Sequence, residues 1–162
     1  MRSENIEPHA GHHAPAKASR TSHPVFWLRS AGSIATVDAA PGETARAIVS
    51  EVAACATRFA ETGELTTIDL RFLKAMAAER ETLAALLGKG EVTATVDSLG
   101  RTEVQETAVP CVWWVRHRDS EGETVGEFIE IADIPDLLMG DPEAVAHGLE
   151  ALRAAVPVGA RE

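Results

Sequence analysis

Apolar residues recur at helical spacing in two stretches of the first half of the chain. The first runs from about residue 43 to 62 and stops before Gly63, which suits the left-handed residue that closes many helices. Its apolar side chains lie four, three and four positions apart, on one face: Ile48, Val52, Cys55 and Phe59. The second runs from about residue 73 to 87 and stops before Gly88. We therefore expect two amphipathic helices, joined by a short extended or turn segment at residues 66–70.

The apolar pattern then changes to a period of two, which is typical of strands. Residues 91–97 alternate cleanly, with Val92, Ala94 and Val96 on one face and threonines and acids on the other. We expect the apolar side chains to face the helices and the threonines and acids to face the far side of the sheet. Turn residues separate three further stretches of strand character: 101–108, 111–118 and 124–131. Because each connection is only a few residues long, the pattern predicts a four-stranded antiparallel meander.

A last helix begins at Asp141-Pro142, because Asp is a good N-cap residue and Pro suits the first helical position. Its apolar stripe again follows helical spacing: Val145, Leu149, Leu152 and Val156. The expected fold is α+β, with two helices before the sheet and one after it, all packed on one face. Within it, the acidic side chains at the end of the sheet are expected to form a solvated edge: Glu127, Glu130, Asp133 and Asp136.

The remaining segments lack this periodicity. Residues 1–24 are rich in His, Pro, Ala and Ser, and we expect a disordered tail. Residues 25–41 are expected to be an arm or linker, residues 42–158 a single domain, and residues 159–162 a flexible C-terminus. Three tail histidines, His9, His12 and His13, are weak candidates for binding nickel or zinc, because no cysteine or supporting shell fixes their geometry.

Composition and charge narrow the range of functions. The chain has 162 residues and a formal net charge of −10, and the folded part carries −11 once the slightly basic tail is set aside. This balance disfavours nucleic acid, whose phosphates attract basic residues. The longest apolar run is too short to span a membrane, no signal peptide is visible, and two cysteines make no disulfide framework. We expect a cytoplasmic protein that does not insert into membranes. No cofactor or catalytic motif is recognisable, so we do not expect an enzyme.

Trp113-Trp114 is the sharpest local feature of the sequence. Adjacent strand residues point to opposite faces of a sheet, so one indole should face the helices and the other the far side. An exposed Trp would be a typical hot spot for protein binding. Alternatively, the arm that begins at residues 25–28 folds over it, or exchanges with the arm of a partner chain.

Several blocks, in this order, resemble the hydrogenase expression/formation proteins of the HupH/HyaF/HoxQ family. The resemblance covers about residues 47–155 and is carried by residues 61–64, 68–71, 86–92, 106–110, 112–115 and 130–138. Two departures stand out. Larger members carry additional sequence before this region, whereas this chain has a single C-terminal-type module. Cys111 also occupies a position where the family leads us to expect Gly.

The resemblance implies a non-catalytic accessory protein, or chaperone, for nickel–iron hydrogenase maturation. The implied partner is a hydrogenase precursor subunit, with the iron–sulfur small subunit as the leading candidate, and a thioredoxin-like maturation protein as a second partner. A homodimer is left open. Around the tryptophan block we assign partner binding to Trp113, Trp114, Arg116, Glu106 and Glu130. The alternatives are a nickel- or zinc-handling accessory that uses the tail histidines, and a general protein-interaction module.

Overall fold

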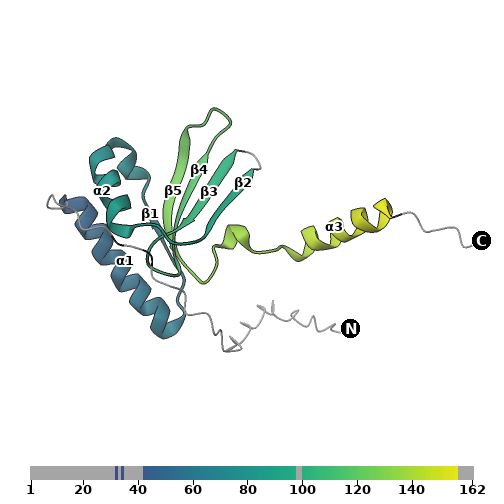
Figure 1. Cartoon of the computed structure of the whole chain (residues 1–162), viewed down its shortest axis with the longest axis horizontal. Coiled ribbons are helices and arrows are strands. Elements are labelled where there is room, and N and C mark those ends of the chain that lie inside the picture. The colour runs from purple at the N-terminus through teal and green to yellow at the C-terminus, as the bar shows by residue number, and fades with distance from the viewer. Residues whose placement is uncertain (1–31, 33, 35–41, 98–99, 157–162) are drawn as a thin grey trace, which may run out of the picture.

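The computed structural model of the chain describes residues 32, 34, 42–97 and 100–156. In these ranges the elements follow the order shown in Figure 1: α1 (Glu43–Thr62), β1 (Thr66–Asp69), the 3-10 helix η1 (Arg71–Ala75), α2 (Ala77–Leu87), β2 (Thr93–Asp97), β3 (Arg101–Glu106), β4 (Val112–Arg118), β5 (Thr124–Ile131), the 3-10 helix η2 (Asp136–Leu138) and α3 (Pro142–Ala155). The N-terminal tail, most of the arm at residues 25–41 and the last six residues lie outside the described residues, so the predictions for them stay predictions.

The strands form one antiparallel sheet in the order β1-β5-β4-β3-β2. The meander of β2 to β5 is confirmed, but the sheet has five strands where we predicted four. The additional strand is β1, in the segment expected to be a short extended or turn connection. It pairs with β5, so that Ile68 lies opposite Ile129. Four residues are too few to show a period of two, and the pairing that makes them a strand comes from a segment about sixty residues later.

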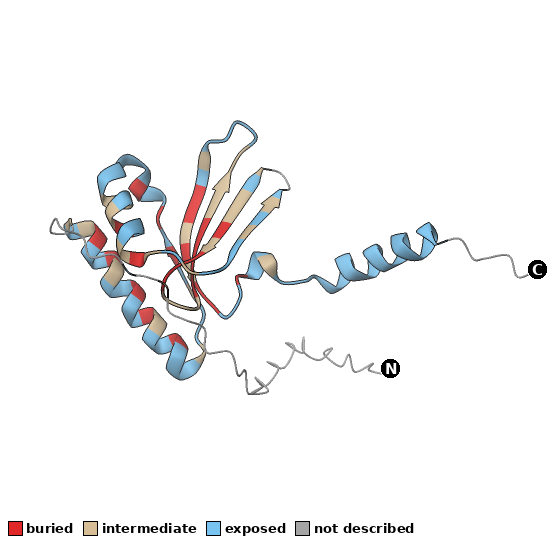
Figure 2. Cartoon of the chain, viewed as in Figure 1, coloured by how far each residue is buried: buried red, intermediate tan, exposed pale blue. Residues whose placement is uncertain are grey.

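Helices α1 and α2 cover one face of the sheet, as predicted (Figures 1 and 2). The predicted apolar stripe of α1 is buried in the core between the helices and the sheet, and α2 contributes Leu83 and Leu87 to the same core. The Glu79 carboxylate of α2 also accepts a hydrogen bond of 2.9 Å from the Ala45 amide in the first turn of α1. This contact satisfies an amide that has no partner within the helix and places negative charge at its positive end. The two helices are therefore held together at their polar ends as well as through the core.

The far face of the sheet carries an apolar cluster of its own. It consists of Val104, Trp113 and Val115, with Ala94, Phe128 and Leu138 packed against it. The sequence had assigned the apolar side of β2 to the helices and its threonines to the far face. The structure reverses this assignment, because the strand register places Ala94, Val104 and Val115 side by side on the face away from α1 and α2.

Helix α3 does not pack on the sheet, which corrects the prediction of a third helix on the same face. Its N-cap follows the prediction, since the Asp141 side chain accepts a hydrogen bond of 3.0 Å from the Glu143 amide. Every residue from Pro142 to Ala155 is nevertheless exposed, and the helix projects away from the sheet (Figure 2). The sequence predicted the apolar stripe of α3, but a local pattern does not show whether the same domain has an apolar surface against which the stripe can pack.

The turn between β3 and β4 contains a residue of unusual backbone conformation. Cys111 has φ 65°, and among the described residues it is the only one other than glycine with a positive φ. A side chain is disfavoured in this left-handed region, whereas glycine adopts it freely. This explains why glycine was the expected residue at the position.

Candidate functional site

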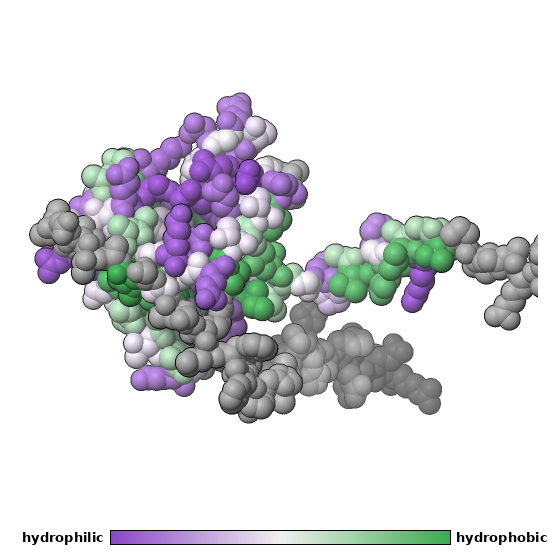
Figure 3. Space-filling model, in the orientation of Figure 1, coloured by the Kyte–Doolittle hydropathy of each residue, from purple (hydrophilic) through white to green (hydrophobic). Residues whose placement is uncertain are grey.

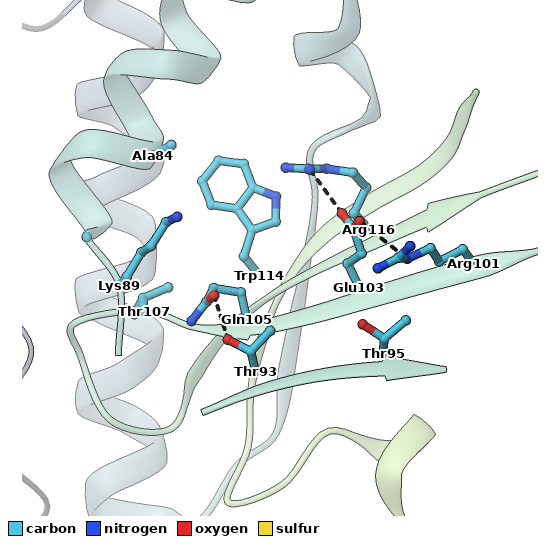
Figure 4. Close-up of a pocket in the computed structure, with 11 residues that line it drawn as sticks. Ala84, Lys89, Thr93, Thr95, Arg101, Glu103, Gln105, Thr107, Trp114 and Arg116 are labelled. Carbon is cyan, nitrogen blue, oxygen red and sulfur yellow. Dashed lines mark hydrogen bonds and ion pairs between the residues drawn. The ribbon is translucent and has the colours of Figure 1, made fainter. Parts of the chain in front are cut away.

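A pocket of about 320 Å³ opens on the helix side of the sheet, beside the C-terminal end of α2 (Figure 4). The helices extend over β1, β5 and β4, which leaves the polar side chains of β2 and β3 to form one wall. The Trp114 indole lies between this wall and α2. The other side chains that define the pocket are mostly polar or charged: Lys89, Thr93, Thr95, Arg101, Glu103, Gln105, Thr107 and Arg116.

Trp114 is held rigidly at the base of this pocket. Its indole Nε1 donates a hydrogen bond of 2.8 Å to Glu127, and the Arg80 guanidinium lies 5.7 Å from the centre of its ring. The residue is only 7 % exposed, so the pocket reaches part of one ring surface. A fixed aromatic surface of this kind suits an apolar side chain or a peptide plane.

Glu127 organises the charged groups behind Trp114. Its buried carboxylate accepts bidentate hydrogen bonds from Arg80 at 2.6–3.0 Å and a further one of 3.1 Å from Arg116. Burial by itself raises the pKa of this carboxyl. The hydrogen bonds from Arg80, Trp114 and Arg116 outweigh that effect, so the pKa is lower than usual. The carboxylate therefore stays ionised and locks the indole to both arginines.

A second glutamate, Glu103, gathers basic groups at the rim of the pocket. Arg116 donates to it over 3.3 Å, and the Nε atoms of Arg101 and Arg118 each lie 3.7 Å from it. Four arginines thus surround two glutamates along this side of the sheet. Among the charged side chains that line the pocket itself, the basic Lys89, Arg101 and Arg116 outnumber the acidic Glu103, so the pocket rim is locally positive on a chain whose net charge is −10.

The polar wall ends at an edge strand. Thr93 of β2 donates a hydrogen bond of 2.8 Å to the Gln105 amide oxygen on β3 (Figure 4). Among the strands that the structure describes, β2 pairs with β3 alone, so its outer edge is unpaired. An edge of this kind offers backbone donors and acceptors to an additional strand.

The five residues to which the sequence assigned partner binding lie on opposite faces of the sheet. Trp114 and Arg116 line the pocket, whereas Glu106, Trp113 and Glu130 lie side by side on the far face. Trp113 is 3 % exposed, and its Nε1 donates a hydrogen bond of 3.0 Å to the Ala132 carbonyl. Neither indole is exposed, which excludes one of the two alternatives that the sequence left open, an exposed Trp. The other alternative concerns the arm at residues 25–28, which lies outside the described residues.

The pKa of Glu130 is shifted in the opposite direction to that of Glu127. Burial raises the pKa of its carboxyl, and the nearby charge of Asp136 raises it further. The predicted solvated acidic edge is therefore wrong for Glu127, which is buried, and for Glu130, which is partly buried. The alternation in β5 could have revealed Glu127, because it places this side chain on the same face as the core residues Ile129 and Ile131.

Arg80 is the main site residue that sequence reasoning missed. It lies in α2, at a position that the apolar pattern leaves on the polar side of the helix, and its partner Glu127 is 47 residues further along the chain. A local pattern carries no signal for such a pair. The structure identifies it only because the fold brings the first turn of α2 against β5.

The described residues include no group of three or more His, Cys, Asp or Glu that could hold a metal ion. Cys55 is buried in the α1 stripe, as predicted, and Cys111 lies in the turn before β4. His9, His12 and His13 lie outside the described residues, so metal binding by the tail stays a prediction. None of the described helices is long and apolar enough to cross a membrane.

Comparison with protein families gives a match that includes every helix and strand described above. The model of the "HupH hydrogenase expression protein, C-terminal conserved region" matches residues 43–158. Among solved structures, the chain is similar to the hydrogenase expression protein HupH from Thiobacillus denitrificans, with a TM-score of 0.62 and 36 % identity. That match covers 71 % of this chain and 96 % of the other.

Curated relatives match over a shorter region. The hydrogenase expression/formation protein HoxQ of Azotobacter vinelandii is 39 % identical over 61 residues, which are 38 % of this chain and 22 % of HoxQ. HupH of Rhizobium leguminosarum bv. viciae is 34 % identical over 77 residues, which are 43 % of this chain and 27 % of that protein. The chain thus spans about a quarter of the length of the curated relatives it matches.

Proposed function

Because the chain belongs to the HupH hydrogenase expression protein family, we propose that it is an accessory protein in the formation of a nickel–iron hydrogenase. The observation that carries this proposal is the family match over residues 43–158, which extends from α1 through α3. In this role the protein binds a precursor subunit during assembly and catalyses no reaction. The precursor of the iron–sulfur small subunit is the proposed client, and a thioredoxin-like maturation protein is a further proposed partner.

The Trp114 pocket is the proposed place of contact with the client. A client segment could enter the pocket with one side chain over the Trp114 ring, while the residues that follow it along the client pair with the open edge of β2. Backbone hydrogen bonds to β2 would supply affinity that depends little on sequence. The Trp114 surface and the rim residues Arg101 and Arg116 would select the inserted side chain.

The charge of the whole chain supports the same proposal at longer range. A net charge of −10 attracts a client segment that carries basic residues and speeds its encounter with the protein. The pocket rim is locally positive, so such a segment would pass along the acidic surface and insert an apolar or neutral side chain. Overall charge would guide the client, and the pocket would fix its position.

Filling the pocket tests this proposal. Thr95 is an exposed pocket residue, and Thr95→Trp places a large side chain in the client's path without changing the net charge. We expect the affinity for the purified small-subunit precursor, measured by biolayer interferometry, to fall at least about tenfold. Thr57→Trp, on the exposed side of α1, is the matched control and should bind like the wild type.

Equal affinities for the two variants would exclude the pocket as the binding site.

Ionic strength tests the role of charge separately. Capture of the precursor should weaken as salt rises from about 0.05 to 0.5 M, because the Debye length shrinks from over 10 Å to under 5 Å. Capture that is equal at both concentrations would contradict charge steering. Capture of the large-subunit precursor alone would contradict the choice of client.

A further inference from the structure

Helix α3 exposes an apolar stripe that nothing in the described structure covers. Val145, Leu149, Leu152 and Val156 are each between 44 and 62 % exposed. The segment just before the helix continues this surface, because Ile134, Leu137 and Met139 are between 43 and 63 % exposed. Figure 3 shows hydrophobic residues both along α3 and on the neighbouring part of the body. We call these seven side chains the C-terminal apolar surface.

A helix with this composition needs a partner. An isolated helix of about 14 residues is only marginally stable in water, and most helices in proteins are stabilised by packing their apolar face. Contiguous exposed apolar surface on a soluble protein usually marks an interaction site. The N-cap hydrogen bond at Asp141 and the regular apolar stripe are typical of a helix that packs its apolar face against another surface.

The segment that leads into α3 directs it away from its own domain. Met139 has ψ 138° and Asp141 has ψ 126°, so both residues are extended, and Pro142 favours that conformation in the residue before it. Gly140 between them has no neighbouring heavy atom within 4 Å of where a Cβ would lie. The helix therefore projects from the sheet on an open connection, in reach of another molecule (Figure 1).

We propose that a second copy of this chain covers the C-terminal apolar surface, with the two α3 helices packed antiparallel about a twofold axis. A stripe centred on one helix face is self-complementary, which is what a twofold interface requires. The polarity of α3 favours the antiparallel arrangement. Glu143 lies in its first turn and Arg153 in its last, so an antiparallel pair brings acidic ends to basic ends and opposes the helix dipoles. A parallel pair would bring like charges together.

The available surface is of the size that a dimer needs. A stable interface buries about 800 Å² on each partner. Helix α3 is about 21 Å long, and burial of one side of it together with Ile134, Leu137 and Met139 provides an area of that order. Because this surface lies apart from the Trp114 pocket in the sequence and the fold, dimerisation would leave the pocket free for a client.

Sedimentation velocity of the full chain at micromolar concentration tests the dimer. We expect the mass of a dimer for the wild type. Leu149→Glu places a charge in the middle of the stripe and should raise the dissociation constant at least about a hundredfold, which gives a monomer. His147→Glu adds the same charge on the polar side of the helix and should remain a dimer. Circular dichroism should show all three proteins folded, because α3 makes no part of the domain core.

Three results would each overturn the proposal: a monomeric wild type, a dimeric Leu149→Glu variant, or equal dissociation of both variants. If the wild type is a monomer that captures the client, and the Leu149→Glu substitution abolishes this capture, then α3 binds the client and not a second copy of the chain. The dimer rests on apolar contacts, so it should persist in about 0.5 M salt, at which a screening length of under 5 Å weakens steering of the client. This difference separates failure of the dimer from failure of the proposed function.

Discussion

Glu127 and Glu130 are two residues of one strand whose carboxyls face opposite sides of the sheet and have opposite shifts in pKa. The pKa of Glu127 is lowered, so its contribution to stability is present above the unfolded value of about 4.3 and is lost as pH falls through the folded value. The pKa of Glu130 is raised by burial and by Asp136. Its ionisation therefore opposes folding at neutral pH, and this cost disappears in acid.

Substitution by glutamine should reveal these opposite signs. At pH 7, Glu127→Gln should have a lower urea midpoint than the wild type, and Glu130→Gln a higher one. Both differences should shrink as the pH is lowered below about 4, where the unfolded chain also binds the proton. Urea unfolding at a series of pH values measures them. Shifts of the same sign at pH 7 would show that the two carboxyls do not differ in this way.

Cys111 provides a test of backbone strain. Its φ of 65° should favour glycine over alanine by about 1 kcal/mol, because a Cβ is disfavoured in the left-handed region. At ordinary positions in helices and strands the order is reversed. We therefore expect Cys111→Gly to unfold at higher urea than Cys111→Ala, although both lose the thiol. A more stable alanine variant would mean that the turn does not hold this conformation in solution.

At the scale of elements, α2 and α3 are both amphipathic but have different roles. Leu83 of α2 is fully buried, whereas Leu149 of α3 is exposed. Leu83→Ala should cost about 3 kcal/mol of unfolding free energy, because it leaves a cavity in the core. Leu149→Ala should cost less than about 0.5 kcal/mol, as at other surface sites. Urea unfolding of dilute protein, where a dimer would dissociate, measures both, and similar costs would show that α3 packs on its own domain.

Helices and strands were predictable from the sequence to the extent that their signals are local. Helix α1 has the predicted bounds, and β5 does too, because each carries a long periodic pattern. The second predicted helix divides into η1 and α2, and the bounds of β2, β3 and β4 shift by one or two residues. The fifth strand was missed, because the hydrogen bonds that define β1 come from β5.

At the scale of the whole molecule, the sequence predicted the α+β class but assigned the wrong face of β2 and β3 to the helices. Alternation shows that Thr93 and Ala94 point to opposite faces, yet it does not show which face the helices cover. The pocket follows from this choice, since α2 lies beside the polar face of β2 and β3. The partner-binding role that the sequence assigns to Trp114 and Arg116 stays a prediction, and the arrangement of these two side chains around Glu127 with Arg80 depends on the tertiary fold.

The charge of the whole molecule acts differently on its two proposed surfaces. Two copies with a net charge of −10 repel each other, so added salt should not weaken the α3 interface. A basic client is attracted by the same charge and loses that attraction in salt. Ionic strength is thus a single variable that separates client binding from self-association.

The positions of the two adjacent indoles give the protein its own optical probes. Trp114 lies in the pocket against a carboxylate and a guanidinium, while Trp113 is buried on the other face against a backbone carbonyl. Indole emission depends on the polarity and charge around the ring. The chain has one further tryptophan, Trp27, so the measurement uses a Trp27→Phe variant. In that variant, a molecule that enters the pocket should change the fluorescence of Trp114 and leave that of Trp113 as an internal reference, without any attached dye.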